Sequence, residues 1–187
     1  ERILLRLPMP SQAEQVVKHA DISFNSEIKT LQALSAAAEK LGKPHKVVLM
    51  IDMGDLREGV FYKNTDLILQ TAKLIEDDPY LILYGTAFNL TCYGSVLPSA
   101  ENISAFLSVT HRIEEQIGRR LDFISGGNSS SIPMLLQGEN SFGVNNLRLG
   151  ESLILGRETA YGADLKELHQ DVVTLEAELV AVQEKPS

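Results

Sequence analysis

The sequence predicts an α/β protein built on a parallel sheet. Short apolar runs alternate with amphipathic stretches through about six strand–helix units. Such alternation is typical of parallel strands joined by crossover helices. Two glycine-rich turns, at residues 126–131 and 148–152, each follow a short apolar run and precede a segment that can begin a helix. They therefore lie where strand would pass into helix in the fifth and sixth units.

The first unit begins with an apolar strand over residues 3–7. Ser11 and Glu14 have the spacing of a capping box, which predicts a short helix that ends near His19. Residues 21–25 form the second predicted strand.

The central units have the clearest patterns. Ser26 can cap a helix whose apolar residues recur at helical spacing, and Gly42 is placed to end it. Residues 46–52 are a continuous apolar run, which is the pattern of a strand buried on both faces. A helix over 64–76 and a strand over 80–88 follow.

The last units lead into the two glycine turns. A helix is predicted over 99–118, and strands over 122–125 and 144–149 precede the turns. Pro133 follows the first turn at a position that suits the first turn of a helix. Ser129 is expected on the surface of that turn.

The alternation alone is compatible with an open sheet or a closed barrel, and the turns decide between them. A glycine turn between strand and helix exposes backbone N–H groups that can hold a phosphate. Barrels use the loops after their seventh and eighth strands in this way. A full barrel needs about 250 residues. We therefore expect an incomplete (β/α)8 TIM-type barrel over residues 1–165, with two units missing before it.

The C-terminal residues depart from the strand–helix rhythm. Residues 164–171 are rich in charge, and residues 172–184 alternate like a strand. We expect 166–187 to be a connector and the first strand of a truncated β-rich second domain. The chain is then an internal piece of a larger protein.

The composition of the chain excludes several classes of binding partner. The formal net charge of −8 argues against nucleic acid or an anionic membrane as the main partner. Cys92 is the only cysteine, which rules out an internal disulfide and favours the cytoplasm. No apolar run approaches the ~20 residues of a membrane span.

Each glycine turn also has a plainer interpretation. The turn at 126–131 fits phosphate binding and a simple serine-capped connection equally well. Arg148, near the end of a strand, can point into a barrel mouth or pair with a nearby carboxylate.

Four motifs in order resemble the fold-type III pyridoxal-phosphate enzymes typified by alanine racemase. They are NS at 128–129, RLGE at 148–151, DMGDLREG at 52–59 and TAFNLTCYG at 86–94. The last of these, together with NLRLGE at 146–151, is most similar to the racemase branch that includes ornithine racemase. The resemblance covers essentially the whole chain.

The resemblance implies pyridoxal 5′-phosphate as the cofactor. Asn128, Ser129, Gly150 and Glu151 would then lie at its phosphate, the last two through backbone N–H groups. Arg148 would face the pyridine nitrogen, where a cation disfavours protonation of the ring.

The resemblance also places Arg57, Asn89 and Thr91 in the substrate pocket, with Cys92 and Tyr93 as further candidates. An ion pair with a neighbouring carboxylate is an equally good interpretation of Arg57.

No catalytic residue of the family is matched within this chain. The family's Schiff-base lysine lies on the first barrel strand and is expected upstream. The second base, a tyrosine, comes from the C-terminal domain of a partner subunit, so the resemblance implies a homodimer.

The sequence thus favours part of an isomerase that interconverts L- and D-amino acids, alanine- or ornithine-like, by two-base transfer of the α-proton. The alternative is a non-catalytic barrel that binds pyridoxal phosphate for its homeostasis. A phosphate-binding barrel of unrelated chemistry is a third possibility. The strand-like residues 172–184 favour the racemase, because the small homeostasis barrels lack a β-rich second domain.

Overall fold

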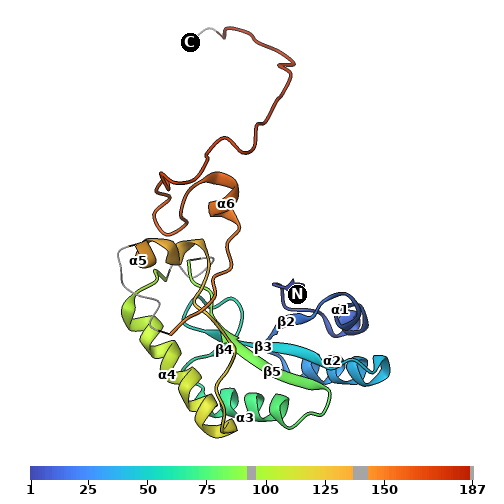
Figure 1. Ribbon diagram of the computed structural model, residues 1–187. Helices are drawn as coiled ribbons and strands as arrows, with labels where there is room; N and C mark the ends of the chain where they lie inside the picture. Colours follow the sequence, from blue (N-terminus) through green and yellow to red (C-terminus); the bar gives the residue numbers. More distant parts are fainter. Residues whose placement is uncertain (92–95, 137–142, 186–187) are drawn as a thin grey trace.

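A computed structural model describes residues 1–91, 96–136 and 143–185 of the chain. In this part, six strands form a sheet that curls into a half-barrel with helices along its outer face (Figure 1). The order is β1-β2-β3-β5-β6, with β4 paired to the end of β3, and every pair is parallel. The strands are β1 (Ile3–Leu4), β2 (Ile22–Asn25), β3 (His45–Asp52), β4 (Val60–Phe61), β5 (Leu81–Ala87) and β6 (Phe123–Ser125). The predicted α/β class and barrel-type curvature are confirmed.

Four longer helices and several short ones connect the strands. They are η1 (Pro10–Gln12), α1 (Ala13–His19), α2 (Ile28–Leu41), α3 (Thr65–Glu76), α4 (Ala100–Ile117), η2 (Ser129–Ser131), α5 (Ile132–Leu136) and α6 (Glu151–Leu155). The side chain of Asn64 caps α3, and Ser99 forms a capping box with Asn102 at the start of α4. Gly42 ends α2 in the left-handed conformation, as predicted.

Two predicted caps do not form. Ser11 lies within the short helix η1 that begins at Pro10, so the predicted capping box with Glu14 is absent and α1 begins at Ala13 without a side-chain cap. The helix α2 likewise follows Glu27, not Ser26, and has no side-chain cap. Both helices depend on packing of their apolar faces, which outweighs a cap worth about 1 kcal/mol.

The half-barrel has apolar residues on both faces of its sheet. Outward residues of β3, such as Val47 and Leu49, pack with Leu34 of α2 and Ile68 of α3 in the main core. The inward face carries a smaller cluster contributed by strands alone: Ile22, Phe24, Val48, Met50, Ala87 and Phe123. Strand β3 is therefore buried on both sides, as its continuous apolar run predicted.

The predicted strand over 144–149 joins the sheet only by an isolated bridge between Ser125 and Asn146. The N–H of Asn145 donates to the carbonyl of Ile124, and the N–H of Gly126 donates to the carbonyl of Asn146. The side chain of Asn145 adds two further hydrogen bonds. Its Oδ1 accepts from the N–H of Ile124 and its Nδ2 donates to the carbonyl of Asp122. At the other edge of the sheet, β1 ends at Leu4, earlier than predicted.

The predicted strand over 172–184 does not form within the described residues. Leu175 is 91% exposed and Val180 is 98% exposed. An alternating apolar pattern makes a strand only where a neighbouring strand supplies hydrogen bonds and a core covers one face. The assignment of 166–187 to a second domain stays a prediction. Among the described helices, none combines the length and the apolar character that crossing a bilayer requires.

A buried histidine makes the fold sensitive to acid. His45, at the start of β3, has no exposed surface, and its Nε2 is 2.8 Å from Ser23 Oγ. Its Nδ1 has no hydrogen-bond partner among the described residues. Burial, reinforced by the charge of Lys43, lowers the pKa of His45 to about 4.

We predict that the free energy of unfolding falls as the pH drops from about 6.5 towards 4. The unfolded chain takes up a proton at His45 in this window and the folded chain does not, which costs about 1.4 kcal/mol per pH unit at most. In His45→Gln this component of the slope should vanish, and in His19→Gln, which changes an exposed histidine, it should persist. Denaturant unfolding at several pH values measures the slopes. Equal slopes in all three proteins would show that His45 does not control the pH dependence of the free energy of unfolding.

Candidate functional site

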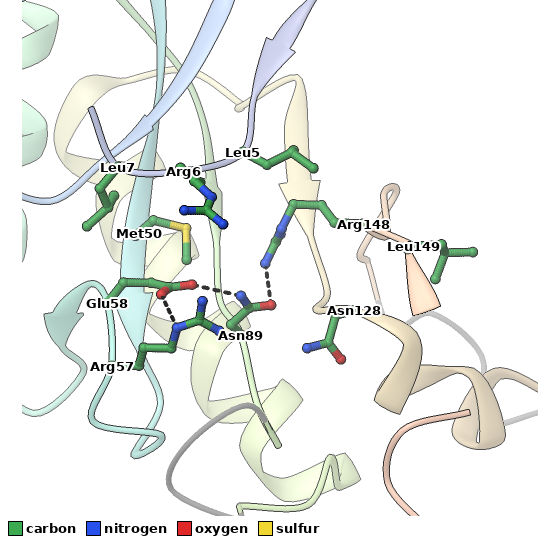
Figure 2. A pocket seen from close by; sticks show the side chains of 11 residues that line it. Leu5, Arg6, Leu7, Met50, Arg57, Glu58, Asn89, Asn128, Arg148 and Leu149 are labelled. Carbon is green, nitrogen blue, oxygen red and sulfur yellow. Dashed lines mark hydrogen bonds and ion pairs between the residues drawn. The ribbon is translucent and has the colours of Figure 1, made fainter. Parts of the chain in front are cut away.

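A pocket of about 510 Å³ opens at the C-terminal edge of the parallel strands (Figure 2). Every residue that lines it lies at the end of a strand or in the loop that follows. They are Leu5, Arg6, Leu7, Met50, Arg57, Glu58, Asn89, Asn128, Arg148, Leu149 and Gly150. This is the edge at which barrels carry their binding sites.

Most of the predicted site residues meet in this pocket. Arg57, Asn89, Asn128, Arg148 and Gly150 all line it, although they come from four separate loops. Their convergence follows from the parallel sheet, since every strand delivers its following loop to the same edge. The roles assigned to these residues stay predictions.

The pocket is cationic in an acidic chain. Arg6, Arg57 and Arg148 bring three guanidinium groups to its wall, against the single carboxylate of Glu58. The chain as a whole carries a formal charge of −8. A local excess of arginine in such a protein favours an anionic ligand, because guanidinium groups match the geometry of phosphate and carboxylate.

A chain of polar contacts crosses the mouth of the pocket (Figure 2). Arg57 Nε lies 3.0 Å from Glu58 Oε2. Glu58 Oε1 accepts from Asn89 Nδ2 at 2.7 Å, and Asn89 Oδ1 accepts from Arg148 Nη2 at 2.8 Å. The two interpretations of Arg57 thus coexist, since it pairs with a neighbouring carboxylate and also lines the pocket.

Arg148 points into the half-barrel and is tightly held there. Its Nη2 donates to the carbonyl of Phe88 at 2.6 Å, and its Nη1 donates to the hydroxyl of Ser125. The guanidinium carbon lies 4.9 Å from the centre of the Phe24 ring on the inward face. The side chain of Arg148 is therefore directed into the half-barrel, which is one of the two orientations that the sequence allowed.

The two glycine turns lie side by side, as expected of neighbouring strand ends. Ser129 Oγ lies 3.0 Å from Ser152 Oγ and accepts from the N–H of Ser152 at 3.2 Å. The N–H of Arg148 donates to the carbonyl of Gly127 at 3.0 Å. Gly127 has φ of +107°, and a Cβ there would lie 2.5 Å from Ser131 Oγ, so only glycine fits.

The polar side chains of the first turn are used to build it. Asn128 Oδ1 accepts from the N–H and hydroxyl of Ser130, and Asn128 Nδ2 donates to the carbonyl of Leu90. Ser129 is only 3% exposed and does not line the pocket, which corrects the expectation of a surface residue. In the described part of the chain, the N–H groups of Gly150 and Glu151 donate to no protein acceptor.

Two further predicted residues lie away from the pocket wall. The side chain of Glu151 is exposed at the first position of α6. Thr91 adopts a left-handed backbone with φ of 62°, and its hydroxyl donates to the carbonyl of Val96 at 2.9 Å. It braces its loop. Cys92 and Tyr93 lie outside the described residues.

Three residues found here were not among the predicted site residues, although Glu58 was one of the carboxylates expected to pair with Arg57. Glu58 lies inside the motif at 52–59 and could have been found from it, whereas nothing in the sequence singles out Arg6. Glu158 is 2% exposed, and its carboxylate accepts from the N–H groups of Ala160, Tyr161 and Ala163. It closes the loop that follows α6.

Comparison with known proteins gives a consistent result. Residues 1–158 match the family described as alanine racemase, N-terminal domain. The chain is 44% identical to the ornithine racemase of Acetoanaerobium sticklandii, over 100% of this chain and 52% of that protein. It is 32% identical to the lysine racemase of Thermotoga maritima, over 99% of this chain and 51% of that protein. The chain thus spans about half the length of the curated relatives it matches.

Solved structures agree on the fold. An alanine racemase of Clostridium difficile 630 in complex with cycloserine has a TM-score of 0.66 at 18% identity, covering 90% of this chain and 44% of that one. PipY of Synechococcus elongatus, solved with pyridoxal phosphate bound, has a TM-score of 0.63 at 19% identity, covering 81% of this chain and 68% of that one.

We predict that Ser129→Asp destabilises the protein even without any ligand. The new carboxylate would be buried beside Ser152 with no cation to pair with, and an uncompensated buried charge costs about 3 kcal/mol. Ser11→Asp is the control, because Ser11 is exposed near a helix start. Thermal unfolding of the ligand-free proteins compares them. An unchanged melting temperature for Ser129→Asp would mean that the Ser129–Ser152 contact does not hold the turns together.

Proposed function

Because the chain belongs to the alanine racemase N-terminal domain family, we propose that the protein containing it is a pyridoxal-phosphate-dependent racemase of a free amino acid. The observation that carries the proposal is the arginine-lined pocket, which lies beside two joined glycine turns at the carboxyl edge of the sheet. The racemase names of the two curated relatives support it.

The residues of the pocket fit the proposed cofactor. Pyridoxal 5′-phosphate carries a phosphate that needs N–H donors, and Gly150 and Glu151 have such groups, which donate to no acceptor among the described residues. Asn128 and Ser129 would shape the cradle from behind, and Arg148 would lie beside the pyridine ring. When bound, the cofactor supplies an electron-withdrawing ring that makes the α-proton of an amino acid removable.

Arg57 is the best candidate to bind the substrate carboxylate. Its side chain is 50% exposed at the pocket mouth, so it can reach a ligand while Glu58 holds it in place. Asn89 would fix the wall between Arg57 and Arg148, and Thr91 would act through its loop. The substrate is alanine- or ornithine-like, and the two curated relatives favour an amino acid with a second amino group.

The proton-transfer groups are proposed to lie outside this chain. Among the described residues, no lysine lines the pocket. We propose that the Schiff-base lysine lies upstream, and that a second base reaches the pocket from the partner subunit of a homodimer. A β-rich second domain after residue 165 and a cytoplasmic location belong to the same proposal.

We predict that the full-length protein racemises L-ornithine, L-lysine or L-alanine when supplied with pyridoxal phosphate, and that residues 1–187 alone do not. Chiral chromatography measures the products. Borohydride reduction of the full-length protein with the cofactor should label a lysine outside this chain. A full-length protein that binds the cofactor without turnover would favour the non-catalytic barrel. A label at a lysine within residues 1–187 would show that the proposed upstream position of the Schiff-base lysine is wrong.

We predict that Gly150→Val weakens pyridoxal phosphate binding by about tenfold or more with little change in ligand-free stability. A Cβ at Gly150 meets nothing within 4 Å, and its φ of −135° lies outside the left-handed region. The side chain would instead occupy space at the proposed phosphate cradle, where each charged hydrogen bond contributes ~1.5–3 kcal/mol. Titration of the full-length protein with the cofactor, beside its ligand-free melting temperature, tests this. Undiminished affinity would remove Gly150 from the cradle.

A further inference from the structure

We propose that Glu58 and Asn89 form a positioning relay that couples Arg57 to Arg148. The relay is the unbroken series of side-chain contacts Arg57–Glu58–Asn89–Arg148 across the pocket mouth (Figure 2). Its importance for cofactor and substrate rests on the function proposed above, but its geometry does not.

The relay joins three separate strand ends. Arg57 and Glu58 lie in the loop between β3 and β4, Asn89 lies just after β5, and Arg148 follows the bridge at Asn146. Each contact is short, at 3.0, 2.7 and 2.8 Å in order along the series. A shift of one loop must therefore be transmitted to the others or break a charge-assisted hydrogen bond.

The amide of Asn89 has only one workable orientation. Its Nδ2 donates to the Glu58 carboxylate and its Oδ1 accepts from the Arg148 guanidinium. A flipped amide would direct its oxygen at the carboxylate and its NH2 at the guanidinium, so both contacts would be repulsive. Glu58 thus fixes Asn89, and Asn89 in turn presents an acceptor to Arg148.

That acceptor is one of the groups that fix the plane of the Arg148 guanidinium. Its Nη2 has two protons, of which one is donated to the Phe88 carbonyl and the other to Asn89 Oδ1. The Asn89 contact is the link between this guanidinium and the opposite wall of the pocket. Without it, Arg148 keeps its contacts to the barrel interior but loses the restraint from the mouth.

The same relay couples the two arginines electrically. Glu58 is 18% exposed and Arg57 is 50% exposed, so Arg57 is the partner that an incoming anion can draw away. Glu58 would then direct its charge at Asn89 alone, which polarises the amide more strongly towards Arg148. An anion at Arg57 therefore tightens the hold on Arg148.

The test compares Glu58→Gln with Glu58→Ala in the full-length protein. Both remove the charge, but only glutamine keeps an acceptor for Asn89 Nδ2. The first readout is the rotation rate of the Arg148 guanidinium, measured by NMR of the ligand-free protein. The second is the affinity for pyridoxal phosphate. We expect Glu58→Ala to speed the rotation and weaken binding at least about threefold. Glu58→Gln keeps the acceptor but loses the charge that polarises the amide, so its effect should be clearly smaller.

If only the charge of Glu58 mattered, both variants would change the two readouts equally. If Glu58 had only a structural role, the variants would lower the melting temperature without changing the rotation of Arg148. Either result overturns the relay. Glu76→Gln is the matched control, because Glu76 also binds an arginine, Arg119, at 2.8 and 2.6 Å but lies away from the pocket. It should leave Arg148 rotation unchanged.

A second pair of variants decides the question if Glu58→Ala fails to fold. Asn89→Ala removes both the donor to Glu58 and the acceptor for Arg148, and should free Arg148. Glu58→Gln/Asn89→Asp restores the series with reversed polarity and the parent's net charge, so the slow rotation should return. No recovery in the double variant overturns the relay. A parent that does not bind pyridoxal phosphate would refute the proposed function, and the ligand-free rotation rates would still decide the relay.

Discussion

The parallel pairing of the strands is the constraint on which the rest of this structure depends. Because β1, β2, β3, β5 and β6 all run the same way, each of them ends at one edge, and every following loop begins there. Residues as distant in sequence as Leu5 and Gly150 can then share one pocket. The arrangement separates two tasks: the outward face of the sheet packs against helices, while the carboxyl edge is left to carry polar and charged groups.

Much of this could be predicted from sequence because the relevant signals are local. The apolar run of β3, the glycine that ends α2 and the position of Arg148 after a strand each reflect physics within a few residues. The predictions that failed concern residues whose environment depends on partners far away in the sequence. Ser129 is buried because Ser152 faces it, and the side chain of Asn145 adds hydrogen bonds to the backbone pairing because it meets β6. Residues 172–184 have a strand-like pattern but no strand beside them.

The sequence predicted which residues belong to the candidate site better than it predicted the contacts between their side chains. The motifs placed Arg57, Asn89 and Arg148 near one another, but no pattern in a single chain says that Glu58 joins them. Side-chain contacts of this kind depend on the separation of strand ends to within an ångström. The motif residues Asn128 and Ser129 both build the first turn, and Asn128 also lines the pocket, whereas Ser129 lies behind it.

The buried carboxylate of Glu158 has a consequence for how this edge meets a ligand. By accepting N–H groups from Ala160, Tyr161 and Ala163, it does for its own loop what a bound anion does for a phosphate-binding loop. The loop is therefore shaped from within. A ligand that bound against this loop would not need to organise it, so little conformational entropy would be lost there on association.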